Sequence, residues 1–136
     1  MKKRLYFLGI CVLLLVSLCS CKITSNKKIS DKKMESQKKE YEEYLAEKYP
    51  DEKFTVNVWQ EYRNQTGGAG LPDYEGYVMR HVVIDSKGNR FRISTLNIGE
   101  YSDDYEDVLN GDKYYNEEGK RVYFDENGEV KYVSDY

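Results

Sequence analysis

Hydrophobic positions follow three successive patterns along this chain of 136 residues. Residues 5–18 form a nearly continuous apolar run, and the polar residues 22–30 that follow show no periodicity and predict a flexible tether. Residues 31–49 place apolar and long side chains at spacings of three and four, which is the period of an amphipathic helix. Pro50 predicts the end of this helix, because the residue before a proline avoids helical geometry. The expected stripe comprises Met34, Gln37/Lys38, Tyr41, Tyr44/Leu45 and Lys48/Tyr49.

Beyond Pro50 the apolar residues alternate with polar ones, which is the period of half-buried β-strands. Turns that contain glycine separate the alternating segments. One helix followed by four or five antiparallel strands predicts a single α+β domain over residues 31–136, with the helix packed on one face of the sheet. The predicted segments after Pro50 are strands at 53–62, 74–85 and 90–98, a short helix near 103–109 and a hairpin over 120–133.

The N-terminus has the layout of a secretory signal peptide: Met1-Lys2-Lys3-Arg4, a short apolar core, and small residues at its end. The apolar core is shorter than the roughly 20 residues that a membrane-spanning helix needs. Leu18-Cys19-Ser20-Cys21 resembles the bacterial lipobox, although Cys19 stands where alanine, serine or threonine is more usual. The resemblance implies that residues 1–20 are removed and that Cys21 carries a diacylglyceryl group as the first mature residue. The alternative is an ordinary signal peptide in which Cys21 is incidental.

The three cysteines of the chain, Cys11, Cys19 and Cys21, are all accounted for by this reading. Cleavage before Cys21 removes two of them, and acylation uses the third. The folded part is therefore expected to contain no disulfide, no thiolate nucleophile and no cysteine metal ligand. The covalent diacylglycerol on Cys21 is the only attached group that we expect. Its two acyl chains are enough for stable membrane anchoring, because a single chain binds only marginally.

Charge divides the expected mature chain into two parts. Residues 22–39 hold seven lysines against Asp31 and Glu35, whereas residues 40–136 hold eleven lysines and arginines against twenty-two acidic residues. The basic segment, next to the lipid, favours an anionic membrane surface, although a merely solvated linker would have the same composition. The acidic remainder makes nucleic acid an unexpected partner.

Two segments resemble known families. The order of elements, with "EYLAEKYPDEKF" at 43–54 and "YSDDY" at 101–105, resembles small membrane-tethered proteins of Gram-positive bacteria. Those proteins have a cystatin-like helix-on-sheet domain and no assigned activity, so the resemblance implies a fold and an envelope location and no catalytic residues. Residues 122–128, "VYFDENG", are similar to the aromatic hairpin of choline-binding repeats, but a single copy without tryptophan indicates an ordinary hairpin.

Aromatic residues supply the candidate binding surface. The chain contains fourteen tyrosines but only one tryptophan, Trp59, and one histidine, His81. Tyrosine buries a ring and keeps a solvated hydroxyl, which suits a thin sheet as well as a recognition surface. We therefore assign Trp59, Tyr62, Tyr77 and His81 as candidate binding residues. The alternative is that these rings only cover a partly buried sheet face, and that His81 is a half-buried strand residue.

An acidic segment near the middle of the domain is the candidate calcium site. Its carboxylates could supply the oxygen ligands that calcium requires, but the spacing of an EF-hand loop is missing, and exposed acidic loops commonly serve solubility. The candidate ligands are Asp103, Asp104, Asp107 and Asp112.

These observations predict a small envelope lipoprotein on the extracytoplasmic face of the cell membrane, acting as a non-catalytic binding module. Its expected partners are the membrane and an envelope protein, peptide or glycan. A cell-wall enzyme is one alternative, and it would need a pocket that contains His81 or two carboxylates of raised pKa. A calcium-dependent binding domain is the other. No catalytic residue is expected, since no nucleophile or phosphate-loop motif is present.

Overall fold

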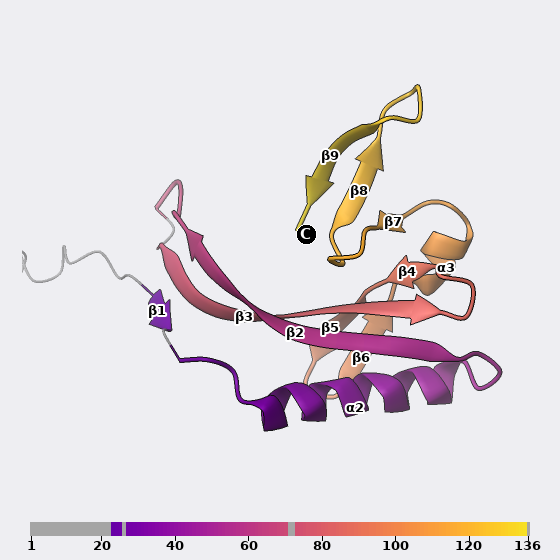
Figure 1. Cartoon of the computed structure of the whole chain (residues 1–136), viewed down its shortest axis with the longest axis horizontal. Helices are drawn as coiled ribbons and strands as arrows, with labels where there is room; N and C mark the ends of the chain where they lie inside the picture. Colours follow the sequence, from indigo (N-terminus) through magenta and orange to yellow (C-terminus); the bar gives the residue numbers. More distant parts are fainter. Residues whose placement is uncertain (1–22, 26, 71–72, 136) are drawn as a thin grey trace, which may run out of the picture. The chain divides into compact units, whose positions relative to one another are not determined.

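The computed structural model describes residues 23–25, 27–70 and 73–135 (Figure 1). The expected signal peptide and Cys21 lie outside the described residues. The chain forms two compact units, a smaller one from Met1–Lys27 and Tyr62–Tyr77 and a larger one from Lys28–Glu61 and Val78–Tyr136. Residues 31–136, expected as one domain, contribute to both units. Among the described residues, no helix has the length and apolar character needed to cross a membrane.

The α+β class is confirmed, with strands distributed over three sheets rather than one. The first sheet has the order β1-β3-β2, with β4 also paired to β3; the second pairs β5 with β6, and the third has the order β7-β8-β9. β1 pairs with β3 in parallel, whereas the pairs β3–β4, β5–β6, β7–β8 and β8–β9 are antiparallel. The elements are β1 Ile23–Ser25, α2 Asp31–Lys48, β2 Phe54–Gln65, β3 Tyr74–Asp85, β4 Arg90–Phe91, β5 Ile93–Asn97, β6 Glu100–Asp103, α3 Tyr105–Leu109, β7 Tyr114–Tyr115, β8 Arg121–Phe124 and β9 Val130–Ser134.

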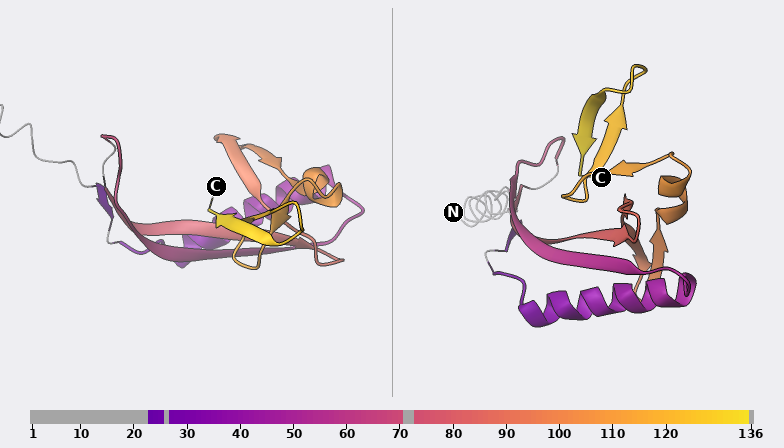
Figure 2. Two further views of the ribbon diagram at one scale, coloured as in Figure 1. Left: turned by 90° about the horizontal axis from the view of Figure 1, so that it is seen from above. Right: turned by 45° about the vertical axis from the view of Figure 1, so that its right-hand side comes forward.

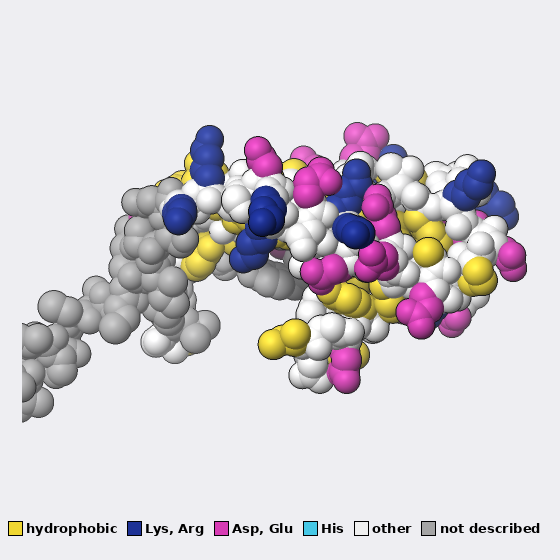
Figure 3. Space-filling view, turned by 90° about the horizontal axis from the view of Figure 1, so that it is seen from below, with side chains coloured by type: hydrophobic (Ala, Val, Ile, Leu, Met, Phe, Trp, Pro, Cys, Tyr) yellow, Lys and Arg dark blue, Asp and Glu magenta, His cyan; other side chains and the backbone are white. Residues whose placement is uncertain are grey.

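Helix α2 follows the sequence pattern closely. Ser30 caps its N-terminus by accepting a hydrogen bond from the backbone N–H of Lys33, at 3.3 Å. The helix ends before Pro50 as expected, and Tyr41 and Leu45 are its buried residues. In the larger unit α2 runs along one side of β2 and β3, while β7, β8 and β9 lie on the other side (Figures 1 and 2). Lysines, acidic side chains and small apolar patches are interspersed on the surface viewed from the side of α2 (Figure 3).

The core of the larger unit lies between α2 and the strands, and aromatic rings dominate it. Phe91, which is fully buried, packs against Tyr105 with ring centroids 4.7 Å apart. Phe54 meets Phe91 and Tyr105 edge-on, at 5.5 and 5.2 Å, and Tyr49 joins the cluster from the end of α2. Such edge-to-face pairs add stability beyond the apolar area they bury. The aliphatic members of the core are Leu45, Val56, Val83 and Ile93.

Two expectations from the strand pattern were wrong. The strand expected at 90–98 is divided at Arg92 into β4 and β5, which belong to different sheets. The tether expected to be flexible contains β1, which pairs in parallel with β3 through Ile23↔Tyr74, Thr24↔Glu75 and Ser25↔Gly76 (Figure 1). Short polar strands carry no clear period, so their pairing depends on the partner strand and not on their own sequence.

One type of turn recurs three times in the larger unit. It joins β3 to β4, β7 to β8 and β8 to β9, and in each copy an Asp or Asn side chain accepts hydrogen bonds from the backbone N–H groups two and four residues later. A glycine with positive φ occupies the fourth position of each copy. The three copies are Asp85–Asn89, Asn116–Lys120 and Asp125–Glu129.

Candidate functional site

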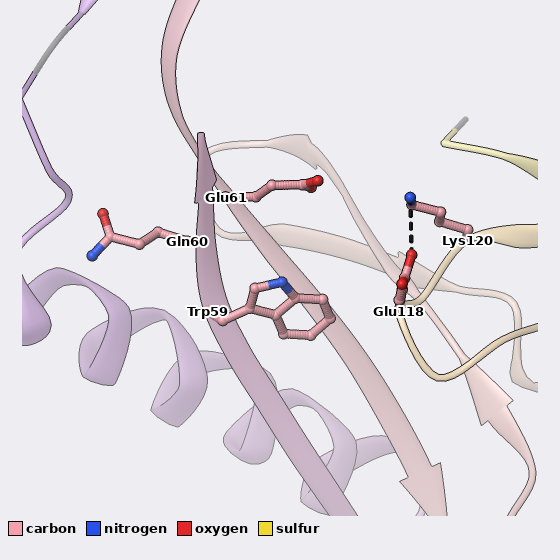
Figure 4. Close-up of a pocket in the computed structure, with 5 residues that line it drawn as sticks. All are labelled: Trp59, Gln60, Glu61, Glu118 and Lys120. Carbon is pink, nitrogen blue, oxygen red and sulfur yellow. Dashed lines mark ion pairs between the residues drawn. The ribbon is translucent and has the colours of Figure 1, made fainter. Parts of the chain in front are cut away.

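A surface cavity of about 320 Å³ in the larger unit has Trp59 as part of its wall (Figure 4). Trp59 and Glu61 come from alternate positions of β2 and point to the same side of the strand, whereas Gln60 points away from them. The side-chain amide of Gln60 instead bonds to the backbone N–H and carbonyl of Ile29, the segment before α2. Glu118 and Lys120 form the other wall. The cavity therefore combines one flat aromatic surface with hydrogen-bond acceptors and one donor.

The turn Asn116–Lys120 holds the second wall in place. Asn116 Oδ1 accepts hydrogen bonds from the backbone N–H groups of Glu118 and Lys120, at 3.0 and 2.9 Å. Gly119 is buried, and a Cβ at this position would lie only 2.6 Å from the backbone oxygen of His81. Glycine thus permits the close approach of this turn to β3, and this contact brings Glu118 and Lys120 opposite Trp59.

Charges at the cavity are matched by neighbouring charges of the same unit. Arg80, only 9% exposed, contacts Glu61 through Nε at 3.0 Å and Asp135 through Nη2 at 2.5 Å. Lys120 lies 2.9 Å from Glu118 and 3.8 Å from Asp135, and its hydrogen bond to Glu118 raises the pKa of the ammonium group. Two cations thus face three carboxylates in one connected network. A ligand at this cavity would meet a surface that is nearly neutral overall.

His81 does not belong to the cavity. Its ring packs on Tyr41 of α2, with centroids 4.7 Å apart, and its Nε2 accepts a hydrogen bond of 3.0 Å from the backbone N–H of Ile93. Burial, reinforced by the nearby positive charge of Arg92, lowers the pKa of His81 to about 4. His81 is therefore a half-buried residue of β3, which is the alternative that the sequence analysis gave for it.

Tyr62 and Tyr77 lie in the smaller unit and contact each other. Their rings meet edge-on with centroids 5.3 Å apart. Tyr62 is 46% exposed and donates a hydrogen bond of 2.5 Å to Glu75 Oε1, which raises the pKa of the phenol. The four candidate binding residues are therefore not gathered in one site: two lie in the smaller unit, His81 packs on α2, and Trp59 lines the cavity.

Asp103, the first residue of the expected calcium site, connects β6 to α2. Its carboxylate accepts hydrogen bonds from Tyr44 and Tyr49 and from the ammonium group of Lys48, at 2.6, 3.0 and 2.8 Å. The backbone N–H of Tyr105 donates a fourth bond. Burial acts to raise the pKa of this carboxyl, but these donors hold it below its ordinary value. Asp103, whose side chain is only 1% exposed, is thus saturated by groups of the chain itself.

The other acidic candidates belong to a different network. Lys113 contacts Asp104 at 2.5 Å and Asp107 at 2.8 Å, and Tyr115 donates a further hydrogen bond to Asp104. Asp112 is exposed, and its backbone N–H bonds to the carbonyl of Asp107. Within residues 23–25, 27–70 and 73–135, no three acidic, histidine or cysteine side chains are grouped so as to hold a metal ion. Lys48 and Lys113 supply the positive charge beside these carboxylates.

Comparison with protein-family models, with curated proteins and with solved structures gave no match. The site must therefore be judged from its own geometry. Sequence reasoning identified Trp59 but missed Glu61, Glu118, Lys120 and the buried Arg80. A signal for one of them was present: the alternation along β2 that places Trp59 on one side also places Glu61 on that side. Glu118 and Lys120, nearly sixty residues farther along, carried no such signal.

Proposed function

We propose that this protein is a lipid-anchored, non-catalytic binding module on the extracytoplasmic face of the cell envelope, and that it binds a glycan at the Trp59 cavity. The lipobox-like Leu18-Cys19-Ser20-Cys21 supports the anchor and the location. The helix-on-sheet arrangement of the larger unit supports a cystatin-like fold. Fold alone does not establish a function, so the proposal depends on the site.

The single observation that carries the proposal is the composition of the cavity wall. The indole of Trp59 offers a flat apolar surface, and Glu61, Glu118 and Lys120 offer polar groups around it. An aromatic platform ringed by a few polar groups is the usual composition of a ligand site. Because the charges there are paired with one another, an uncharged, hydroxyl-rich ligand suits the surface better than an ion does. An envelope glycan meets this description better than a charged peptide.

The arrangement of titratable groups supports a binding role over a catalytic one. A general base must reach a substrate proton through a free acceptor atom. His81 Nε2 is already occupied by the backbone N–H of Ile93, and its low pKa reflects a packed ring. The pKa values of Asp85 and Asp103 are also lowered, because several donors satisfy each carboxylate. His81, Asp85 and Asp103 thus stabilise the fold through hydrogen bonds within the chain.

The proposal can be tested with Trp59 as an internal reporter, since it is the only tryptophan of the chain. The full chain in detergent is titrated with soluble glycan strands prepared from cell walls, while tryptophan fluorescence is excited selectively over tyrosine. We expect a saturable change in intensity or wavelength. Glu118→Gln should weaken binding about fivefold, because one hydrogen-bonding carboxylate is lost. Glu126→Gln, the same substitution at an exposed residue of another turn, is the matched control and should bind normally.

Trp59→Ala should weaken glycan binding about tenfold when binding is followed by calorimetry, since the aromatic platform is removed. The free energy of unfolding of this variant should fall by less than the free energy of glycan binding does, because Trp59 is only partly buried. Equal affinity of Trp59→Ala and the parent protein would refute the assignment of the site. Saturable binding of charged peptide stems without any response to glycan strands would refute the assignment of the ligand.

A further inference from the structure

In the smaller unit, β1 begins two residues after the expected lipid attachment point and pairs with the start of β3. Only Lys22 stands between Cys21 and Ile23, the first residue of β1. Two residues of chain span at most about 7 Å, whatever their conformation. Because Ile23 pairs with Tyr74 at the start of β3, a lipid on Cys21 is connected to this strand by a very short link. The lipid and the hairpin end cannot move far apart while β1 stays paired.

The composition of the smaller unit suits the boundary between lipid and water. It contains Tyr62, Tyr74 and Tyr77, and Tyr62 is exposed while the other two are half-buried. Tyrosine is enriched at membrane interfaces, where its ring meets the apolar region and its hydroxyl remains hydrated. A large patch of aromatic rings is not required, since the acyl chains provide most of the attraction.

Charge also favours this unit over the larger one as the membrane-facing part. Its described charged residues are Lys27 and Arg63 against Asp73 and Glu75, which balance one another. The larger unit contains most of the acidic residues of the chain and would be repelled by an anionic lipid surface. Lys22 adds one more positive charge next to the anchor.

We propose that β1 and the adjoining ends of β2 and β3 dock on the lipid surface, so that the anchor orients the hairpin instead of merely tethering it. This inference rests on the proposed lipidation of Cys21. It adds a defined contact surface, the end of the β2–β3 hairpin beside β1, where Tyr62 and Tyr77 contact each other. The occupant of this surface is the headgroup region of a bilayer. The short link from Cys21 and the pairing of β1 with β3 keep the face against the membrane.

The experiment compares two insertions of the same ten-residue Gly-Ser segment. One insertion lies between Lys22 and Ile23 and separates the lipid from β1; the other lies between Lys27 and Lys28 and leaves that link short. A flexible segment of this length has an end-to-end distance of about 17 Å, which is enough to free the hairpin end. The exposed Thr66, directly after β2, is replaced by cysteine and carries a fluorophore. The acylated, processed full chain is reconstituted into vesicles of anionic and zwitterionic lipid that contain a headgroup-nitroxide quencher.

We expect strong quenching of the Thr66→Cys label in the parent protein and in the insertion after Lys27. The insertion before Ile23 should lose most of this quenching while the protein still sediments with the vesicles. Equal quenching of both insertion variants would overturn the proposal, because it would mean that β1 does not couple the lipid to the hairpin. An unquenched label on a parent protein that sediments would also overturn it, and would indicate that an envelope protein or glycan covers this surface.

Cys21→Ser separates failure of this inference from failure of the proposed function. It should abolish sedimentation with the vesicles and quenching of the label, and it should leave the glycan response of Trp59 intact. Sedimentation of Cys21→Ser equal to the parent would refute the lipid anchor and this orientation with it. Loss of the Trp59 response alone, with the quenching pattern retained, would refute only the glycan site.

Discussion

The two sides of β2 and β3 in the larger unit are built from different contacts. On the side of α2, rings and aliphatic groups are buried, and the polar groups among them, such as Asp103, Asp85 and His81, are bonded within the chain. On the opposite side, Trp59 and charged residues of β2 and of the turn Asn116–Lys120 surround a cavity open to solvent. Buried groups that are fully satisfied contribute stability but leave nothing for a ligand. The comparison therefore assigns stability to the first side, and the second side is the one where we propose that a ligand binds.

The largest expected effect concerns the aromatic core. Phe91→Ala should lower the free energy of unfolding by about 3–5 kcal/mol, because it empties a fully buried position in contact with two other rings. Urea denaturation followed by circular dichroism measures this change. Phe124→Ala is the matched control, since Phe124 on β8 is 43% exposed, and it should cost less than about 1 kcal/mol. Similar losses for both variants would remove the distinction between the buried side and the exposed sheet.

Asp103 provides the next test. Asp103→Asn should lower the free energy of unfolding by about 2–3 kcal/mol, because it removes the charge that faces Lys48 and places an amide donor among four other donors. The change can be followed by thermal melting. Asp107→Asn makes the same substitution at a half-exposed carboxylate that contacts Lys113, and it should cost less than about 1 kcal/mol. A large loss in Asp107→Asn with none in Asp103→Asn would contradict the assigned roles.

The third test is the dependence of stability on pH through His81. Its pKa is about 4 in the folded chain, against an ordinary value of 6.5. Between these values the unfolded chain binds a proton that the folded chain does not, so acidification through this window lowers the free energy of unfolding. The expected loss is at most about 3 kcal/mol, and it is complete only when the pH falls below the folded pKa.

The control for this effect is His81→Gln, which keeps an acceptor for the N–H of Ile93 without titrating. The free energy of unfolding of both proteins is measured at near-neutral pH and again near the folded pKa. The parent protein should lose more stability than the variant, and the difference reports His81 alone, since the carboxylates are common to both. An identical pH dependence of parent and variant would mean that the imidazole remains accessible to protons in the folded chain.

Local patterns in the sequence were enough for most of the elements. Spacings of three and four predicted a helix at 31–49, and the structure has α2 at Asp31–Lys48. Alternation predicted a strand at 74–85, the bounds of β3. It did not predict that the adjacent residues Val82 and Val83 would both be buried. That occurs because α2 covers one face of β3 while the turn at Gly119 covers the other.

The sequence could not predict the pairing of short segments. The break at Arg92 and the addition of β1 to the sheet depend on which distant backbone is available as a partner, and two or three residues contain too little periodicity to indicate it. The recurrent turn has a sequence signature, in which Asp or Asn is followed three residues later by glycine. The sequence analysis did not use this signature.

The sequence by itself thus determined the helix and the long strands. Each of these depends on neighbouring residues along the chain. Only the tertiary structure decided that the Asp103 carboxylate bonds to Tyr44 and Lys48 of α2, that His81 is half-buried against Tyr41, and that Glu118 and Lys120 face Trp59. These outcomes depend on contacts between residues tens of positions apart. The packing of the whole unit determines such contacts, and a local sequence pattern does not indicate them.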